Sequence, residues 1–231
     1  MAKAFTIGKI VRWLALMTAA ILVLLLLIIL LFRFVNPPTS TFMLGYQLGG
    51  EARPLSHEWV PISDISPWMP LAVVASEDQR FPEHWGVDFK AIRQALSEYR
   101  AGEGLRGAST ITQQTAKNLF LWNDRSFVRK AIEAGLALTL DLLWPKERIL
   151  EVYLNIAEFG PGIYGVEAAS QAYFGIPARQ LSAWQSARLA AVLPNPRALS
   201  VTRPSEYVQD RVFWIREQMN QLSGLAYLRD L

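Results

Sequence analysis

Residues 107–118 read GASTITQQTAKN and predict the start of a helix. Thr110 and Gln113 match a capping box, in which a hydroxyl and an amide three residues later satisfy free N–H groups of the first turn. Ser182 and Gln185 repeat this pattern further along the chain. We therefore expect helices to begin at both places.

Apolar residues at helical spacing extend the pattern. In residues 146–156, Ile149, Val152, Tyr153 and Ile156 fall at i, i+3, i+4 and i+7, which predicts an amphipathic helix. The sequence has no internal repeat and no long alternating run, so we expect a mainly α fold. Cap residues and prolines mark further helix boundaries at Ser66-Pro67, at Asp88 before apolar residues between 89 and 99, and at Pro194-Asn195-Pro196.

The composition excludes several kinds of site. The 231 residues carry a net charge of +3 and include no Cys and only two His, His57 and His84. Disulfides, a thiol nucleophile and Cys-based metal sites are therefore excluded, and His offers too few ligands for a zinc site. The length suits one domain with appendages.

The positive charge is confined to the N-terminus. Residues 1–33 hold four basic side chains and no acid, whereas the remaining residues hold 19 basic and 20 acidic side chains. Because contacts to a phosphate backbone need a basic surface, the composition argues against nucleic acid as a partner.

Residues 13–32 contain no charged side chain, and Thr18 is their one polar residue. At about 1.5 Å per residue this run makes roughly 30 Å of helix, the thickness of a bilayer's hydrocarbon core. A cleaved signal peptide is the alternative, but the run is longer than a usual signal core and lacks a small-x-small cleavage site. We therefore expect a retained transmembrane helix over residues 13–33.

The flanking charges predict the orientation of this helix. Three basic residues precede it, whereas after Arg33 the next basic residue is Arg53. The positive-inside rule then places the N-terminus in the cytoplasm and the rest of the chain outside it. The expected order is a cytoplasmic tail at 1–12, the membrane helix at 13–33, a linker at 34–56 and the folded domain at 57–231.

Three polar blocks carry side chains suited to chemistry. In the first, Glu77 and Asp78 stand with Arg80 and His84 where an apolar helix ends. Partial burial and a neighbouring like charge both raise the pKa of a carboxyl group, which suits a general base. Considered alone, a surface turn with an ordinary Glu/Arg pair is the better interpretation.

The second block follows the helix start at Thr110. Gln113 and Lys117 fall at i and i+4, and Gln114 and Asn118 repeat the spacing on the next face. Amides and a cation suit sugar hydroxyls or phosphate, and a helix start offers N–H groups to anions. An ordinary solvated helix gives the same pattern.

The third block places Glu133 four residues after Arg129 and three after Lys130, within reach of both on one helix. By itself, such a cluster is a surface ion pair of little energetic consequence.

Together, the blocks are more specific than any one of them. They read Glu77-Asp78-Gln-Arg-Phe81-x-x-His84-x-Gly86, Gly107-x-Ser109-Thr110-Ile111-Thr112-Gln113-Gln114-x-x-Lys117-Asn118, Arg129-Lys130-x-x-Glu133 and Lys146-x-Arg148-Ile149-Leu150-Glu151-x-Tyr153-Leu154-Asn155. In this order they resemble the signature blocks of the peptidoglycan glycosyltransferases, the module also found at the N-terminus of class A penicillin-binding proteins. The resemblance covers about residues 57–220.

The resemblance implies a lysozyme-like glycosyltransferase domain that follows one N-terminal transmembrane helix. Its substrate would be lipid II, a disaccharide-pentapeptide joined by pyrophosphate to a polyprenyl chain. The reaction would extend a nascent glycan strand through a β-1,4 link with inversion at the anomeric carbon. The implied location is the bacterial plasma (inner) membrane with the domain in the periplasm, and the implied partners include cell-wall synthesis or division proteins.

Motif positions imply roles for individual residues. Glu77 resembles the base that takes the proton of the acceptor's 4-OH, and Glu133 resembles the second essential carboxylate, near the donor pyrophosphate. Loops like the one that carries Arg125 vary in the family, so Lys117 is the firmer of these two phosphate-binding cations. The other positions that bind or support the substrate are Asp78, Phe81, His84, Ser109, Gln113, Gln114, Asn118, Arg129 and Lys130.

Two further expectations concern cofactors and chain organisation. The resemblance leaves room for a divalent cation (Mg or Mn) at the pyrophosphate, although the sequence shows no metal-ligand cluster. The sequence has no Ser-x-x-Lys or Lys-Thr-Gly motif and stops at Leu231, so we expect the monofunctional, membrane-anchored form.

Two other functions stay open at this point. A hydrolase of the same fold would use Glu77 as a general acid on a neutral glycosidic bond, and would need no cations at the cleft. A non-catalytic anchored module would recruit cell-wall enzymes and would tolerate the loss of Glu77. Residues 119–122 and Phe127 fit either the core or contact with the bilayer surface.

Overall fold

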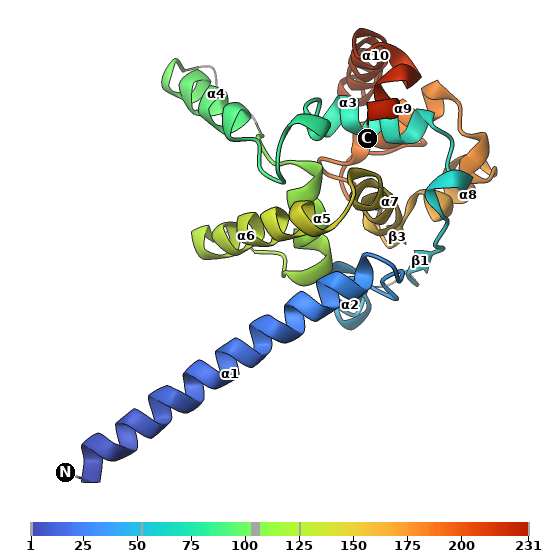
Figure 1. Ribbon diagram of the computed structural model, residues 1–231. Helices are drawn as coiled ribbons and strands as arrows, with labels where there is room; N and C mark the ends of the chain where they lie inside the picture. The colour runs from blue at the N-terminus through green and yellow to red at the C-terminus, as the bar shows by residue number, and fades with distance from the viewer. Residues whose placement is uncertain (1, 52, 103–106, 125, 231) are drawn as a thin grey trace. The chain divides into compact units, whose positions relative to one another are not determined.

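The computed structural model describes residues 2–51, 53–102, 107–124 and 126–230. The chain divides into two compact units, Met1–Pro37 and Pro38–Leu231. Helices make up most of the described residues and are accompanied by three short strands, so the predicted mainly α fold is confirmed (Figure 1).

The first unit is dominated by a single helix, α1 (Ala2–Phe32). Its stretch Ile7–Phe32 is long and apolar enough to cross a membrane. Apolar side chains such as Trp13 and Leu24 are exposed along it, so the helix requires apolar surroundings. It starts earlier than the predicted 13–33, because no proline interrupts the residues before Trp13. The helix fits a single-pass membrane anchor.

The second unit begins with a short helix inside the segment predicted as a linker. The Ser40 hydroxyl accepts a hydrogen bond from the Met43 N–H at 3.2 Å and caps α2 (Thr41–Leu48). Met43 and Tyr46 are buried, and α2 packs against a later helix of the same unit. Part of residues 34–56 is therefore folded, because two large apolar side chains find partners there.

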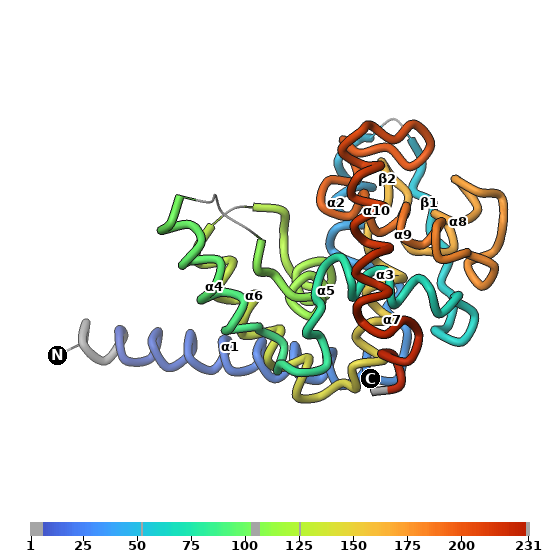
Figure 2. The backbone as a smooth tube through the Cα atoms, turned by 90° about the horizontal axis from the view of Figure 1, so that it is seen from above, coloured from blue at the N-terminus to red at the C-terminus, as the bar shows by residue number. Residues whose placement is uncertain are grey.

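Three helices pack around the first polar block. They contact one another and are α3 (Trp68–Glu77), α9 (Ala183–Val192) and α10 (Glu206–Gln221) (Figure 1). In Figure 2, α10 runs past both α9 and α3. Residues 71–75 of α3 are fully buried, and this packing fixes the helix end that carries Glu77. The predicted capping box of Ser182 is present at the start of α9.

A second group of helices carries the other two polar blocks. α5 (Ile111–Phe120) packs against both α6 (Phe127–Leu143) and α7 (Lys146–Ile156). The predicted capping box at Thr110 is present, and α7 spans the predicted residues. Ser126 caps α6 by accepting a hydrogen bond from the Arg129 N–H. Because α5 lies against α6, the second block stands beside the third.

A small sheet joins one strand before α3 to two strands after α7. The strands and the helix that packs on them are β1 (Ser56–His57), β2 (Glu158–Gly160), β3 (Ile163–Tyr164) and α8 (Val166–Phe174). The strand order is β1-β3-β2, with β1 parallel and β2 antiparallel to β3. Short 3₁₀ helices lie at Ile62–Asp64, Phe81–Glu83, Ala178–Gln180 and Gly224–Asp230.

The helix predicted after Asp88 is α4 (Phe89–Arg100). The Asp88 side chain accepts hydrogen bonds from two N–H groups of the first turn, which confirms the predicted cap. Within α4, however, Ala95 is the one buried residue, and Phe89 and Tyr99 are 59% and 58% exposed. The apolar spacing thus predicts the helix correctly but not a place in the core.

The prediction that Ser66 caps α3 is wrong. Pro67 occupies the N-cap position, and the Ser66 hydroxyl instead donates a hydrogen bond of 2.6 Å to the Leu181 carbonyl oxygen. Ser66 is buried, so its hydroxyl requires a partner inside the protein. The Ser-Pro pair still marks the helix start.

Candidate active site

Glu77 is the last residue of α3, where the helix gives way to a turn at Asp78. The Gln114 amide nitrogen donates to Oε2 of Glu77 at 3.0 Å, and Nη2 of Arg211 donates to Oε1 at 3.1 Å. Burial raises the pKa of the Glu77 carboxyl group, against the opposing effects of Gln114 and Arg211. The like charge of Asp78 also raises this pKa, as the sequence predicts, but it is the smallest of these effects.

Tyr153 orients the amide of Gln114. Its hydroxyl donates a hydrogen bond of 3.1 Å to the amide oxygen. With the oxygen turned to a donor, the amide nitrogen faces Glu77. Burial raises the pKa of Tyr153 well above its ordinary value, so the phenol keeps the proton that it donates.

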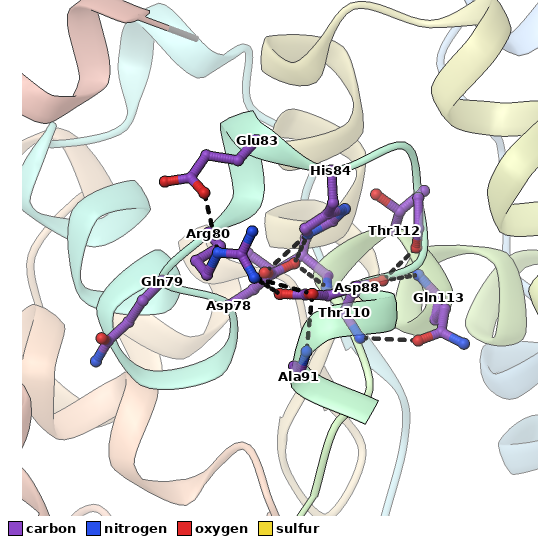
Figure 3. A network of polar contacts seen from close by, with 12 residues as sticks. Asp78, Gln79, Arg80, Glu83, His84, Asp88, Ala91, Thr110, Thr112 and Gln113 are labelled. Carbon is purple, nitrogen blue, oxygen red and sulfur yellow. Dashed lines mark hydrogen bonds and ion pairs between the residues drawn. The ribbon is translucent and has the colours of Figure 1, made fainter. Parts of the chain in front are cut away.

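Asp78 and His84 form a buried network (Figure 3). Nε2 of His84 lies 2.9 and 3.0 Å from the two carboxylate oxygens of Asp78. The Ile111 N–H donates to Oδ2 of the same carboxylate at 3.0 Å. Ile111 opens α5, where N–H groups lack helical partners. The network therefore ties the turn after α3 to the start of α5, and both side chains hold the framework of the site.

Gly86 lets this turn approach α6. Its φ is +72°, and a Cβ at this position would lie 2.4 Å from the Ala137 carbonyl oxygen. The Thr110 hydroxyl donates to the Gly86 carbonyl oxygen at 2.6 Å. Phe81 is fully buried, with the Lys146 ammonium 4.6 Å from its ring centroid. Phe81 therefore anchors the turn in the core and does not line the cleft.

Gln113 and Asn118 make contacts that belong partly to the fold. The Gln113 amide oxygen accepts the Thr110 N–H at 3.0 Å within the capping box, and Gln113 is buried. The Asn118 carbonyl oxygen accepts the Thr41 hydroxyl at 3.0 Å. Their predicted roles in substrate binding stay predictions.

The charges of both predicted catalytic carboxylates act on Lys117. Burial lowers the pKa of its ammonium group, and the negative charges of Glu133 and Glu77 act in the opposite direction. Its Nζ is 5.4 Å from the ring centroid of Phe42. Among the described residues, no hydrogen bond or ion pair reaches this ammonium group. Lys117 is thus a half-buried cation with unused donors.

Glu133 is held by two cations on its own helix, as the spacing predicts. Nη1 of Arg129 donates to Oε2 at 2.6 Å, and Nζ of Lys130 donates to Oε1. Lys130 also donates to the Ser109 hydroxyl at 2.7 Å. Glu133 is 2% exposed, whereas the Lys130 side chain is 44% exposed. The carboxylate is therefore buried and paired, with one of its cations open to a ligand.

A cleft of about 950 Å³ runs from the end of α3 along α4 and α10. Glu77, Ser109, Gln114 and Arg211 are among its lining residues, and Glu133 is not. Lys130 connects the cleft with Glu133, because its ammonium group bonds both Ser109, which lines the cleft, and Glu133, which does not. Residues of the first two polar blocks thus line the cleft, whereas Lys117 and the third block do not. The third block adjoins the cleft through the bond of Lys130 to Ser109.

Two contacting residues lie outside the predicted set. Arg211 comes from α10, and no spacing pattern links that helix to the first block. Tyr153 belongs to the fourth block, where its apolar spacing predicts a core residue. The signal for a further role is that the hydroxyl of a buried tyrosine requires a hydrogen-bond partner. The predicted Arg125 lies outside the described residues.

The residues near Glu133 do not form a metal site by themselves. In the described part of the chain, no group of three or more His, Asp or Glu side chains is arranged to hold a metal ion. The Glu133 carboxylate is already paired with Arg129 and Lys130. Mg is commonly bound by one or two carboxylates together with substrate phosphates, and Glu133 would have to give up one of its two cations to act as such a ligand.

Known proteins are similar in sequence to this chain over most of its length. A model of the transglycosylase family matches residues 46–220. A biosynthetic peptidoglycan transglycosylase of Marinomonas sp. (strain MWYL1) is 60% identical over 87% of this chain and 87% of its own length. Proteins with the same name from Shewanella frigidimarina (strain NCIMB 400) and Salmonella typhi are 57% and 53% identical, over 86% and 94% of this chain and 85% and 92% of their own lengths. The chain therefore belongs to the transglycosylase family and is a glycosyltransferase.

Proposed function

We propose that this enzyme polymerises peptidoglycan glycan strands from lipid II, with Glu77 as the general base. The 4-OH of the acceptor sugar attacks the anomeric carbon of the growing strand. A new C–O bond forms with inversion and gives a β-1,4 link, while the bond to the pyrophosphate breaks. The hydroxyl proton passes to Glu77, and the polyprenyl pyrophosphate leaves with the bonding electron pair.

One observation carries this assignment: Glu77 is a largely buried carboxylate at the cleft, and donors hold both of its oxygens. Its side chain is 12% exposed, and burial raises its pKa toward the range useful for accepting a proton. Each carboxylate oxygen has two lone pairs, so the contacts of Gln114 and Arg211 leave acceptor capacity for a sugar hydroxyl. A base so placed contributes roughly 10²–10⁴-fold to the rate.

The cations around Glu133 suit the leaving group. Negative charge develops on the pyrophosphate as it departs, and positive groups fixed in a partly dehydrated site stabilise that charge. Lys117 offers an ammonium group with unused donors, and Lys130 offers an exposed one. Glu133 holds Arg129 and Lys130 in place, and its negative charge offsets the repulsion between these two cations. We assign this cluster to the donor pyrophosphate.

The anchor suits the substrate. A polyprenyl chain stays in the bilayer, so an enzyme that uses it works at the membrane surface. The basic residues before the span support an orientation with the N-terminus in the cytoplasm and the catalytic domain in the periplasm. Cell-wall synthesis or division proteins are the partners to seek at this location.

The decisive experiment compares the wild type with Glu77→Gln in a lipid II polymerisation assay. The amide keeps the size of the side chain but cannot accept the proton, so we expect near-complete loss of polymer with the melting temperature little changed. Glu51→Gln is the matched control, because the Glu51 side chain is 41% exposed and pairs with Arg197, and neither residue lines the cleft. A Glu77→Gln enzyme that keeps a tenth of wild-type turnover would overturn the assignment.

A second arm distinguishes synthesis from cleavage. The wild type should polymerise lipid II and leave purified sacculi intact. Release of soluble muropeptides from sacculi would identify a hydrolase of this fold instead. Repeating the assay with a chelator measures any need for Mg or Mn.

A further inference from the structure

The guanidinium group of Arg211 is the least expected contact of the base. It reaches Glu77 from α10, 134 residues further along the chain. The pair is largely buried, with 18% of the Arg211 side chain and 12% of the Glu77 side chain exposed. Because water is mostly excluded, this ion pair is screened less than a surface pair.

The surroundings of Arg211 hold it for this one contact. Its guanidinium carbon lies 6.0 Å from the ring centroid of Trp214, one turn further along α10. Its Nε is buried and has no hydrogen-bond partner in the described residues. The bond from Nη2 to Glu77 is the one polar contact seen for this side chain in that part of the chain. An arginine that served the fold alone would satisfy more of its donors.

The two donors to Glu77 bind different oxygens of its carboxylate. Gln114 holds Oε2 from α5, and Arg211 holds Oε1 from α10. Two contacts from different helices fix the plane of the carboxylate as well as its position. Arg211 also supplies the positive charge, which the amide does not.

We propose that Arg211 is a positioning residue, which fixes the Glu77 carboxylate toward the acceptor sugar and keeps it ionised until the proton arrives. This proposal rests on the proposed role of Glu77 as the base. As the proton arrives, Glu77 becomes neutral and the ion pair weakens. Arg211 makes no bond to the substrate in this role and acts through Glu77.

In the described part of the chain, Glu77 interacts electrostatically with four ionisable groups. Asp78 follows it in the chain, Arg211 faces it from α10, and Lys117 and Tyr153 act on it from α5 and α7. The two cations favour the charged carboxylate, whereas burial and Asp78 oppose it. Arg211 is the cation in direct contact, so its removal should let burial dominate.

The test is the pH profile of kcat/KM for lipid II polymerisation in Arg211→Gln and Arg211→Met. The acid limb reports the ionisation of the base in the free enzyme. Loss of the positive charge raises the pKa of Glu77, so we expect the limb to move to higher pH. At a pH on the wild-type acid limb, kcat/KM should fall about tenfold or more. Either variant that folds suffices for the test.

Two further variants separate this role from a structural one. Arg211→Lys keeps the charge but not the forked geometry, so its acid limb should stay near that of the wild type while kcat falls severalfold. Arg216→Gln is the matched control on the same helix, because the guanidinium carbon of Arg216 lies 5.9 Å from the Trp184 ring centroid and Arg216 does not line the cleft. It should keep both the limb and the rate.

The outcomes are distinct. A folded Arg211→Gln or Arg211→Met enzyme with the acid limb of the wild type overturns the inference, even if its rate is lower. Glu77→Gln is measured in parallel. If Glu77→Gln is inactive while the limb stays unmoved, only the role of Arg211 fails. If Glu77→Gln polymerises lipid II, the proposed function itself loses its base.

Discussion

The amide of Gln114 links Tyr153 to Glu77, accepting a hydrogen bond from the phenol and donating one of 3.0 Å to the carboxylate. A residue in the core of α7 thereby sets the direction of a donor at the cleft. The sequence places all three residues in signature blocks, but only the structure shows that they act in series.

Gln114→Ala should lower kcat/KM about tenfold and move its acid limb to higher pH, because the amide bond lowers the pKa of Glu77. Tyr153→Phe should have a smaller effect in the same direction, since the amide remains but loses its orientation. The measurement is lipid II polymerisation as a function of pH. Gln171→Ala is the matched control, because the Gln171 amide donates to a carboxylate, Glu167, outside the cleft. Equal losses in Gln114→Ala and Gln171→Ala would argue against this role.

Lys117→Ala should weaken the interaction with the donor and lower kcat/KM about 10²-fold, as expected for the loss of one preorganised charge. Lys90→Ala removes an exposed ammonium of α4 and should leave kcat/KM unchanged. Dependence on donor concentration is the readout. An unchanged donor response in Lys117→Ala would remove Lys117 from the site.

The alkaline limb of the pH profile of lipid II polymerisation should report the ionisation of Lys117. Burial lowers the pKa of Lys117, so its positive charge is present at low pH and is lost at a lower pH than that of an ordinary lysine. Polymerisation should therefore decline on the alkaline side as this ammonium deprotonates. Lys117→Arg keeps the charge at all relevant pH values and should move the limb to higher pH. If the alkaline limb of Lys117→Arg stays where it is in the wild type, the limb reports the titration of another group.

Glu133→Gln should affect both stability and activity. Removing the buried carboxylate leaves Arg129 and Lys130 without their shared partner, and a loss of about 3 kcal/mol in the free energy of unfolding is typical of such a broken pair. Glu151→Gln breaks a comparable pair with Arg148 on α7, away from the cleft. Urea unfolding and lipid II polymerisation are measured on both variants. We expect Glu151→Gln to lose stability and keep its activity, whereas Glu133→Gln loses both.

Gly86→Ala tests the turn that holds the site. A Cβ there would lie 2.4 Å from the Ala137 carbonyl oxygen, and φ is +72°. Gly102 has a similar φ of +84°, but a Cβ added to it would meet no heavy atom within 4 Å. Gly102→Ala should therefore cost only the backbone strain, about 1–3 kcal/mol, and Gly86→Ala clearly more. Equal melting temperatures for the two variants would show that the turn can move away from α6.

Local signals predicted much of the fold. The capping boxes at Thr110 and Ser182 and the spacing within residues 146–156 gave helix starts that the structure confirms. These signals work because a cap and an amphipathic face are satisfied within a few residues. α2 was not predicted, because its stability comes from the burial of Met43 and Tyr46 against distant parts of the chain.

The candidate site was predictable in part for the same reason. Arg129, Lys130 and Glu133 interact within one helix, so their spacing was enough to place them together. The role of Arg211 was not predictable, because its contact with Glu77 depends on how α10 packs against α3. The hydrogen bond of Ser66 was not predictable for the same reason, since its hydroxyl donates to the carbonyl oxygen of Leu181, which is distant in the sequence.

The separation of Glu77 and Arg211 along the chain also sets the order in which the site is assembled. A chain still being synthesised exposes α3 long before residue 211 exists, and until α10 docks the carboxylate lacks its cation. The pairing of Glu77 with Arg211 thus appears only once the chain has been made and folded through α10. An unfinished or C-terminally clipped molecule would carry the anchor and the carboxylate at the membrane without this ion pair.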